Sequence, residues 1–140
     1  GSYTQSKMHE QGVTCGNCHE PHSNRLRIEG NGLCTQCHNP GGRPDFPTLR
    51  RLDYESGEHH FHAQTAASPG CVSCHMADKT YMVIDDRRDH SFRIPRPDLS
   101  VSLNTPNACN DCHADKTAQW AAARIQDWYP GNPPDHFAPI

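Results

Sequence analysis

Apolar residues are scarce in this sequence. They make up 34% of its 140 residues, against about 45–50% in ordinary soluble domains, and the mean hydropathy is −0.87. With 12 prolines and 10 glycines as well, such a chain buries too little apolar surface to fold on side-chain packing alone. The length predicts a single domain over residues 1–140, so we expect something other than apolar side chains to form its core.

Other absences exclude whole classes of function. No apolar run is long enough to span a membrane, and no signal peptide is recognisable. The net charge of −3 gives no basic patch that would favour a nucleic-acid partner. No Ser-His-Asp arrangement or phosphate-binding loop is evident in the chain.

Cysteine, by contrast, is used in one pattern throughout. All eight cysteines lie in four copies of C-x-x-C-H: Cys15-Gly16-Asn17-Cys18-His19, Cys34-Thr35-Gln36-Cys37-His38, Cys71-Val72-Ser73-Cys74-His75 and Cys109-Asn110-Asp111-Cys112-His113. A disulfide framework has no need of a histidine after every second cysteine. A zinc site takes four ligands from two such pairs with no fixed trailing histidine, and a thioredoxin-like redox pair occurs once. The repeated motif therefore indicates covalent attachment of c-type haem.

The pattern assigns a role to each motif residue. Two cysteines on one turn of helix each form a thioether to the haem edge, and the following histidine binds the iron from the proximal side. We expect four haem c groups held by Cys15, Cys18, Cys34, Cys37, Cys71, Cys74, Cys109 and Cys112, with His19, His38, His75 and His113 as proximal iron ligands. The expected fold is mainly α with much irregular loop, a small multihaem cytochrome c fold in which stacked haems replace the hydrophobic core. The chain without haem is then expected not to fold.

Between the motifs the sequence predicts short elements. Asn39-Pro40-Gly41-Gly42 ends the second motif, and residues 41–56 are expected to be loop. Ser56 is predicted to cap a helix from Gly57 to about Ala67, and residues 81–84 to form a short strand. We also expect N-caps at Thr105 and Asp115, the latter for a helix through Tyr129 with Ala121, Ile125 and Trp128 on one face, and an extended tail over 130–140.

At this point the chain resembles a known family. The segments that carry the resemblance are Cys71-Val72-Ser73-Cys74-His75-Met76, Tyr81-Met82, residues 89–97 and Thr105-Pro106-Asn107-Ala108-Cys109. They resemble multihaem c-type cytochromes of the cytochrome c554 and pentahaem nitrite-reductase kind, and in particular multihaem segments of tetratricopeptide-repeat cytochromes. Ala77 departs from the proline usual after Cys-His-Met. The resemblance implies an extracytoplasmic electron carrier or reductase subunit. Larger relatives have a further upstream haem, so the chain can be a segment of a longer cytochrome.

Seven histidines remain as candidates for the distal iron positions. His22 lies too close to His19 to reach the opposite face of that haem, so it is assigned to a neighbouring one, most simply the haem on His38. His59 and His62 are predicted to share a helical face, and the resemblance favours both. His90 lies in the segment most like the family. The remaining candidates are His60, expected to pair with a propionate, His9 as a reserve ligand, His136 as a ligand to another copy's haem, and the methionines Met8, Met76 and Met82 as alternative axial ligands.

Filled distal sites predict electron transfer, because iron with two axial histidines cannot bind a substrate. The alternative is a reductase of nitrite or hydroxylamine with one open haem, which the absence of a C-x-x-C-K motif disfavours. Haem attachment to this motif takes place outside the cytoplasm, so we expect a periplasmic or extracellular protein whose leader has been removed. Expected partners are redox proteins or extracellular acceptors, with a homo-oligomer or head-to-tail filament as a possible assembly. Ten of the 13 basic residues are arginines, which suit either haem propionates or ordinary surface charge.

Overall fold

The computed structural model describes residues 1–65 and 68–131 of the chain. These residues form two compact units. The first comprises Gly1–Val72 together with His90–Phe92, and the second comprises Ser73–Asp89 together with the described residues from Arg93 onward. The prediction that residues 1–140 make one tetrahaem domain stays a prediction.

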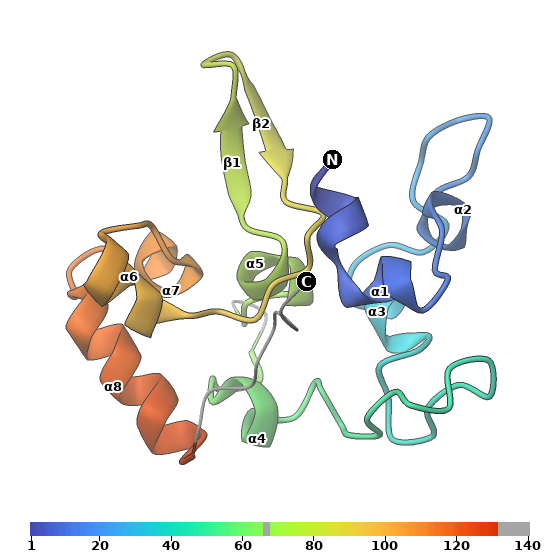
Figure 1. Ribbon diagram of the computed structural model, residues 1–140. Helices are drawn as coiled ribbons and strands as arrows, with labels where there is room; N and C mark the ends of the chain where they lie inside the picture. Colours follow the sequence, from blue (N-terminus) through green and yellow to red (C-terminus); the bar gives the residue numbers. More distant parts are fainter. Residues whose placement is uncertain (66–67, 132–140) are drawn as a thin grey trace. The chain divides into compact units, whose positions relative to one another are not determined.

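The first unit is built from single helical turns joined by irregular chain (Figure 1). In order, these are η1 (Ser2–Gln5), α1 (Lys7–Glu10), α2 (Cys15–Cys18), α3 (Gly32–Thr35) and α4 (Gly57–His60). Helices this short are not stable on their own in water, and side chains at their ends compensate in part. The Ser6 hydroxyl accepts from the His9 amide at 3.2 Å to cap α1. Residues 41–56 are irregular, as expected.

Helix α5 (Cys71–His75) begins in the first unit and ends in the second. The second unit continues with strands β1 (Asp78–Tyr81) and β2 (Asp85–Arg88) and helices α6 (Pro97–Leu103), α7 (Ala108–Cys112) and α8 (Ala118–Trp128). Helices α6 and α7 both pack on α8. Along α8, Ala121 is buried and Ile125 and Trp128 are half-buried, which confirms the predicted inner face.

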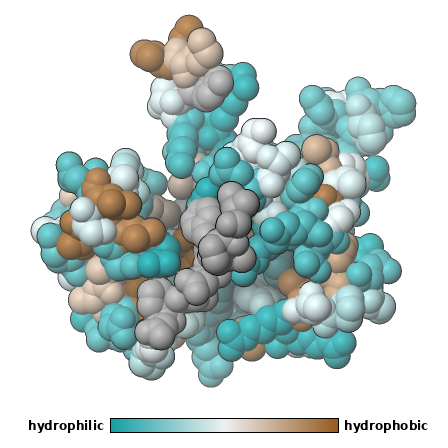
Figure 2. All heavy atoms as spheres, viewed as in Figure 1, coloured by the Kyte–Doolittle hydropathy of each residue, from teal (hydrophilic) through white to brown (hydrophobic). Residues whose placement is uncertain are grey.

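The two strands form an antiparallel hairpin that the sequence pattern did not predict. Asp78 pairs with Arg88 at its base and Tyr81 with Asp85 at its tip. The predicted strand over residues 81–84 is therefore wrong, because Met82, Val83 and Ile84 form the turn between the strands. Their apolar side chains are 74%, 93% and 90% exposed, and Figure 2 shows them as an apolar tip above hydrophilic strands.

Three further predictions about helices are corrected. The helix expected to run to about Ala67 ends at His60, because Phe61 adopts a left-handed conformation with φ of 54°; Ala67 itself lies outside the described residues. Asn107, not Thr105, caps α7, and Thr117, not Asp115, caps α8. Helix α6, which Pro97 begins and Asn104 ends with φ of 53°, was not predicted.

The protein contributes very little buried apolar surface of its own. Among the described residues, five are buried: Ser6, Ser91, Pro97, Ser100 and Ala121. Three of these five are serines, so side-chain packing supplies no continuous hydrophobic core. This is the arrangement expected of a polypeptide that wraps a large apolar cofactor.

Within residues 1–65 and 68–131, none of the helices combines the length and apolar character needed to cross a bilayer.

Candidate haem-binding site

The four motifs adopt one local geometry. In three of them the amide of the motif histidine donates to the carbonyl of the first cysteine, from His19 to Cys15 at 2.8 Å and at 2.9 Å in the second and fourth motifs. The third motif lies wholly within α5. Each motif thus closes one turn of chain that carries both cysteines and the histidine, which is the arrangement that lets two sulfurs and one imidazole approach the same ring.

Polar side chains cap these short turns. The Thr14 amide donates to the Asn17 side-chain oxygen at 2.7 Å in the first motif. In the fourth motif the Asn107 side-chain oxygen accepts from the amides of Cys109 and Asn110 at 3.1 and 3.2 Å. Such caps stabilise a helix end by about 0.5–2 kcal/mol. These hydrogen bonds come from the polypeptide alone, so they stabilise the two motif helices independently of any cofactor.

None of the eight cysteines forms a disulfide in the structure. Within residues 1–65 and 68–131, no group of three or more His, Cys, Asp or Glu side chains is assembled as a metal site. A hydrogen bond between the thiols of Cys34 and Cys71 raises the pKa of Cys34 and lowers that of Cys71 to about 7. Burial, and then the nearby charge of Cys37, raise the pKa of Cys18. Sulfurs of the first three motifs therefore lie close together.

Two motif histidines have a defined orientation. Nδ1 of His19 lies 3.1 Å from the carbonyl oxygen of Asn24, and Nδ1 of His75 lies 2.9 Å from that of Arg93. Donation from Nδ1 to a backbone carbonyl is the usual way in which a protein orients a metal-binding imidazole. It places the lone pair on Nε2, the nitrogen that would bind iron. Asn24 presents its carbonyl from a left-handed conformation, φ 60°, which asparagine tolerates well.

The ring of His90 lies close to that of His19. Their ring centroids are 6.3 Å apart and the ring planes are inclined by 32°. Two bonds of about 2.0 Å from a metal to histidine nitrogens, plus about 1.15 Å from each nitrogen to its ring centroid, give about 6.3 Å. The two rings are thus spaced as they would be with one iron between them. Both residues belong to the first unit.

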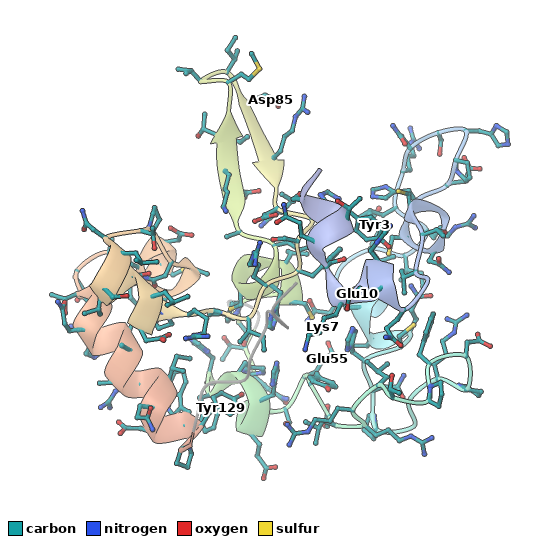
Figure 3. The ribbon with its side chains drawn as sticks, in the orientation of Figure 1. Tyr3, Lys7, Glu10, Glu55, Asp85 and Tyr129 are labelled. Carbon is teal, nitrogen blue, oxygen red and sulfur yellow. The ribbon has the colours of Figure 1, made fainter. Side chains whose placement is uncertain are left out.

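An aromatic contact chain holds His90 in this position. Its ring contacts that of Phe92 edge-on at 6.0 Å, and Phe92 contacts Tyr3 at 6.2 Å. Tyr3, labelled in Figure 3, donates its hydroxyl to the carbonyl of Val13, just before the first motif. Phe92 has a left-handed backbone with φ of 49°, and such strain in a non-glycine residue persists only where surrounding contacts impose it.

The segment around His59 and His62 differs from the prediction. Because α4 ends at His60, His59 and His62 do not share a helical face. The Tyr54 ring lies edge-on to both His38 and His59, at 5.5 and 5.0 Å, so the second motif histidine and a predicted distal histidine border one tyrosine. Nδ1 of His62 donates to the His60 carbonyl, which again places the lone pair on Nε2.

His60 has a different task from the one predicted. Its Nε2 lies 3.0 Å from the Glu55 carbonyl, and its Nδ1 accepts from the His62 amide at 3.1 Å. Both ring nitrogens are therefore occupied by backbone groups, which leaves neither for iron or a propionate. The ring centroids of His60 and His62 are 6.1 Å apart, yet this hydrogen bonding distinguishes the pair from His19 and His90.

The other candidates are placed as follows. His22 is exposed on the loop after the first motif, where its amide donates to Glu20, and the described ring contacts join it to no other histidine; its ligand role stays a prediction. His9 is exposed and contacts Tyr3 edge-on at 5.5 Å. The ring of His113 lies against that of Trp120 in α8, with centroids 5.0 Å apart. His136 lies outside the described residues.

Many arginines pair with nearby aspartates. The pairs are Arg43–Asp45, Arg87–Asp85, Arg88–Asp78, Arg96–Asp98 and Arg124–Asp127, at 2.6 to 3.2 Å. These five pairs are ordinary ion pairs between neighbouring segments of the chain, and the pairing of any arginine with a haem propionate stays a prediction. Arg27 instead supports the first motif, donating from Nε to the carbonyls of Gly16 and His19 at 2.7 and 3.2 Å.

Several residues that build the site were not predicted from sequence. Tyr3, Asn24 and Asn31 hold motif or distal residues through contacts that no local pattern reveals. Asn31 carried one available signal, since an asparagine three residues before Cys34 is a typical helix N-cap. Its second contact, described below, is to a residue far along the chain.

No family model matches the chain, and no curated protein matches it. Among solved structures, the chain is similar to the crystal structure of the outer cell wall cytochrome OcwA, with a TM-score of 0.54 and 23% identity over 84% of this chain. The match covers 26% of that protein, so the chain spans about a quarter of its length. This similarity confirms the predicted fold class: a small, mainly helical and irregular multihaem cytochrome fold, here with one two-stranded hairpin.

Proposed function

We propose that the chain is an electron-transfer protein, a tetrahaem c-type cytochrome whose haems are bound by two histidines each. The observation that carries this proposal is the spacing of His19 and His90, 6.3 Å between ring centroids, with the Nδ1 of His19 held by a backbone carbonyl. Filled axial positions permit a change of oxidation state and exclude substrate binding. When bound, each haem supplies a site that gains or loses one electron.

The chain's own residues fit this cofactor in three respects. Each of the four motifs presents two cysteines that form no disulfide, together with one imidazole, on a single turn of chain. His62 and His75 have the same Nδ1-to-carbonyl orientation as His19. The described residues supply almost no hydrophobic core, since Ala121 and Pro97 are the buried apolar residues among them, so bound haems would provide the apolar interior. The distal set in this proposal is His22, His59, His62 and His90. Bis-histidine ligation implies low reduction potentials relative to histidine–methionine cytochromes.

The location and partners form part of the same proposal. Covalent attachment to C-x-x-C-H takes place outside the cytoplasm, and the structural neighbour is a cytochrome of the outer cell wall. We infer a periplasmic or extracellular protein that exchanges electrons with redox proteins or extracellular acceptors. Head-to-tail assembly into a filament is a further prediction, which sedimentation and electron microscopy of the haem-loaded protein test.

Two measurements on the haem-loaded protein test the proposal. The intact mass should exceed the polypeptide mass by four haems, and thiol titration should find no free cysteine. The ferric absorption and electron paramagnetic resonance (EPR) spectra should be wholly low-spin. Bound zinc, or haem extracted by acid-acetone, would refute the cytochrome assignment.

The histidines of the second unit bear on the alternative function, a reductase. In the described part of the second unit, the histidines are His75 and His113, and both are motif histidines. If the haem on His113 has an open distal face, it is the place where nitrite or hydroxylamine would bind. A high-spin ferric fraction of about one quarter that shifts on adding nitrite would support this function, and a wholly low-spin spectrum excludes it.

A further inference from the structure

Asn31 contacts two attachment motifs at once. As the N-cap of α3, its backbone carbonyl accepts from the Cys34 amide at 2.8 Å. Its side-chain oxygen accepts from the Cys71 amide at 2.9 Å. Both contacts lie within the first unit. One residue thus holds the first cysteine of the second motif beside the first cysteine of the third.

The surroundings of Asn31 fix the orientation of its amide. Its Nδ2 donates to Oε1 of Glu55 at 3.2 Å, so the side-chain oxygen must face Cys71. Gly70 allows the approach, because a Cβ at that position would lie 3.1 Å from the Asn31 oxygen. The hydrogen bond between the Cys34 and Cys71 thiols shows that the sulfurs, as well as the backbones, are neighbours.

The same contacts extend to a predicted distal ligand. The backbone carbonyl of Glu55 faces Nε2 of His60 at 3.0 Å, and Nδ1 of His60 accepts from the His62 amide at 3.1 Å. The side-chain Nε2 of Gln64 also donates to the Glu55 carbonyl at 2.6 Å. Glu55, labelled in Figure 3, therefore joins the Asn31 contact to the His60–His62 segment. Successive hydrogen bonds therefore link Cys71 to Asn31, Asn31 to Glu55, Glu55 to His60, and His60 to His62.

We propose that Asn31 is a positioning residue that holds Cys34 and Cys71 side by side, so that the second and third haems are attached as direct neighbours along their thioether edges. This inference rests on the proposed function. It adds an adjacency that the sequence does not show, since 32 residues lie between the second and third motifs against 14 between the first and second. An electron leaving one haem of this pair reduces the other, one iron being oxidised as its neighbour is reduced, with no proton or further reactant.

The adjacency is tested on the wild-type holoprotein by nuclear magnetic resonance (NMR). In the fully reduced, diamagnetic state, protons of the thioether substituents at Cys34 and at Cys71 should show nuclear Overhauser effects to each other. Their absence in a protein with four low-spin haems would overturn the inference and leave the electron-transfer function standing. A protein without covalent haem would instead overturn the function itself.

The role of Asn31 is tested by substitution, with Asn107 as the matched control. Asn107 caps one motif only, through Cys109 and Asn110. In Asn31→Ala we expect four attached haems but no nuclear Overhauser effects between the thioether protons at Cys34 and Cys71. We also expect a weaker redox interaction between the second and third haems, measured by a redox titration followed by NMR. Asn107→Ala should leave both unchanged. Asn31→Asp keeps the oxygen acceptor for Cys71 and should retain the effects, which provides a second variant if Asn31→Ala does not mature. Unchanged effects in Asn31→Ala, or equal losses in Asn107→Ala, would show that Asn31 does not position the pair.

Discussion

Replacing His90 with alanine should convert one haem of the four to high spin. The ring centroids of His90 and His19 are 6.3 Å apart, which matches the spacing expected of two imidazoles on one iron. Removal of His90 takes one axial nitrogen from the haem of the first motif and leaves the other three motifs untouched. About one quarter of the ferric iron should therefore change spin state, on a count of four motifs.

The fold should survive this change, so the spectrum remains readable. His90 contributes one edge-on contact to Phe92, and such a contact stabilises by about 0.5–1.5 kcal/mol. The contact between Tyr3 and Phe92 persists in the variant. Low-temperature EPR and ferric absorption of the holoprotein quantify the high-spin fraction, and intact mass confirms that four haems remain attached.

His60→Ala is the matched control for a nearby histidine. Both ring nitrogens of His60 are occupied by backbone groups, so its loss should leave every haem low-spin. The hydrogen bond from His62 to the His60 carbonyl does not depend on the His60 side chain. If His90→Ala leaves the spectrum unchanged while His9→Ala produces high-spin iron, the pairing of His90 with His19 is wrong.

Three further predictions concern stability. Protein made without haem attachment should show no cooperative unfolding transition by calorimetry, because few described residues are buried; a sharp transition would contradict the cofactor-based core. Val83 holds φ of 69° in the hairpin turn, so Val83→Gly should raise the opening free energy of the hairpin, measured by hydrogen exchange, by about 1 kcal/mol, whereas Ile84→Gly, which relieves no positive φ, should give no gain. Arg96 lowers the pKa of Asp98 below its ordinary value, so this carboxylate stabilises the fold above that ordinary value and the contribution is lost as pH falls through the lowered one. In Arg96→Gln, the free energy of unfolding should fall less steeply as the pH is lowered, by less than about 1 kcal/mol in total, because the pair is partly exposed. An identical pH dependence of thermal unfolding in the variant would show that the pair contributes nothing.

Local sequence predicted the short turns at the four motifs well and the elements between them less well, while haem attachment at these motifs stays a prediction. The motif turns follow from residues adjacent in the chain, and the structure has all four. The longer helix after Ser56 failed because Phe61 adopts a left-handed conformation, which propensity does not anticipate in an aromatic residue. The strand at residues 81–84 failed because a run of apolar residues normally indicates a strand, whereas here it occupies a turn.

The sequence by itself predicted which residues attach haem, because two cysteines and a histidine lie within five positions of one another whatever the rest of the chain does. Only the tertiary structure decided which histidines face one another and which motifs are neighbours. His19 and His90 come together through Tyr3 and Phe92, and Cys34 and Cys71 through Asn31. These are contacts between distant segments. Histidines that look equivalent in composition, such as His60 and His62, acquire different roles because the hydrogen bonds of each ring depend on backbone groups that folding brings to it.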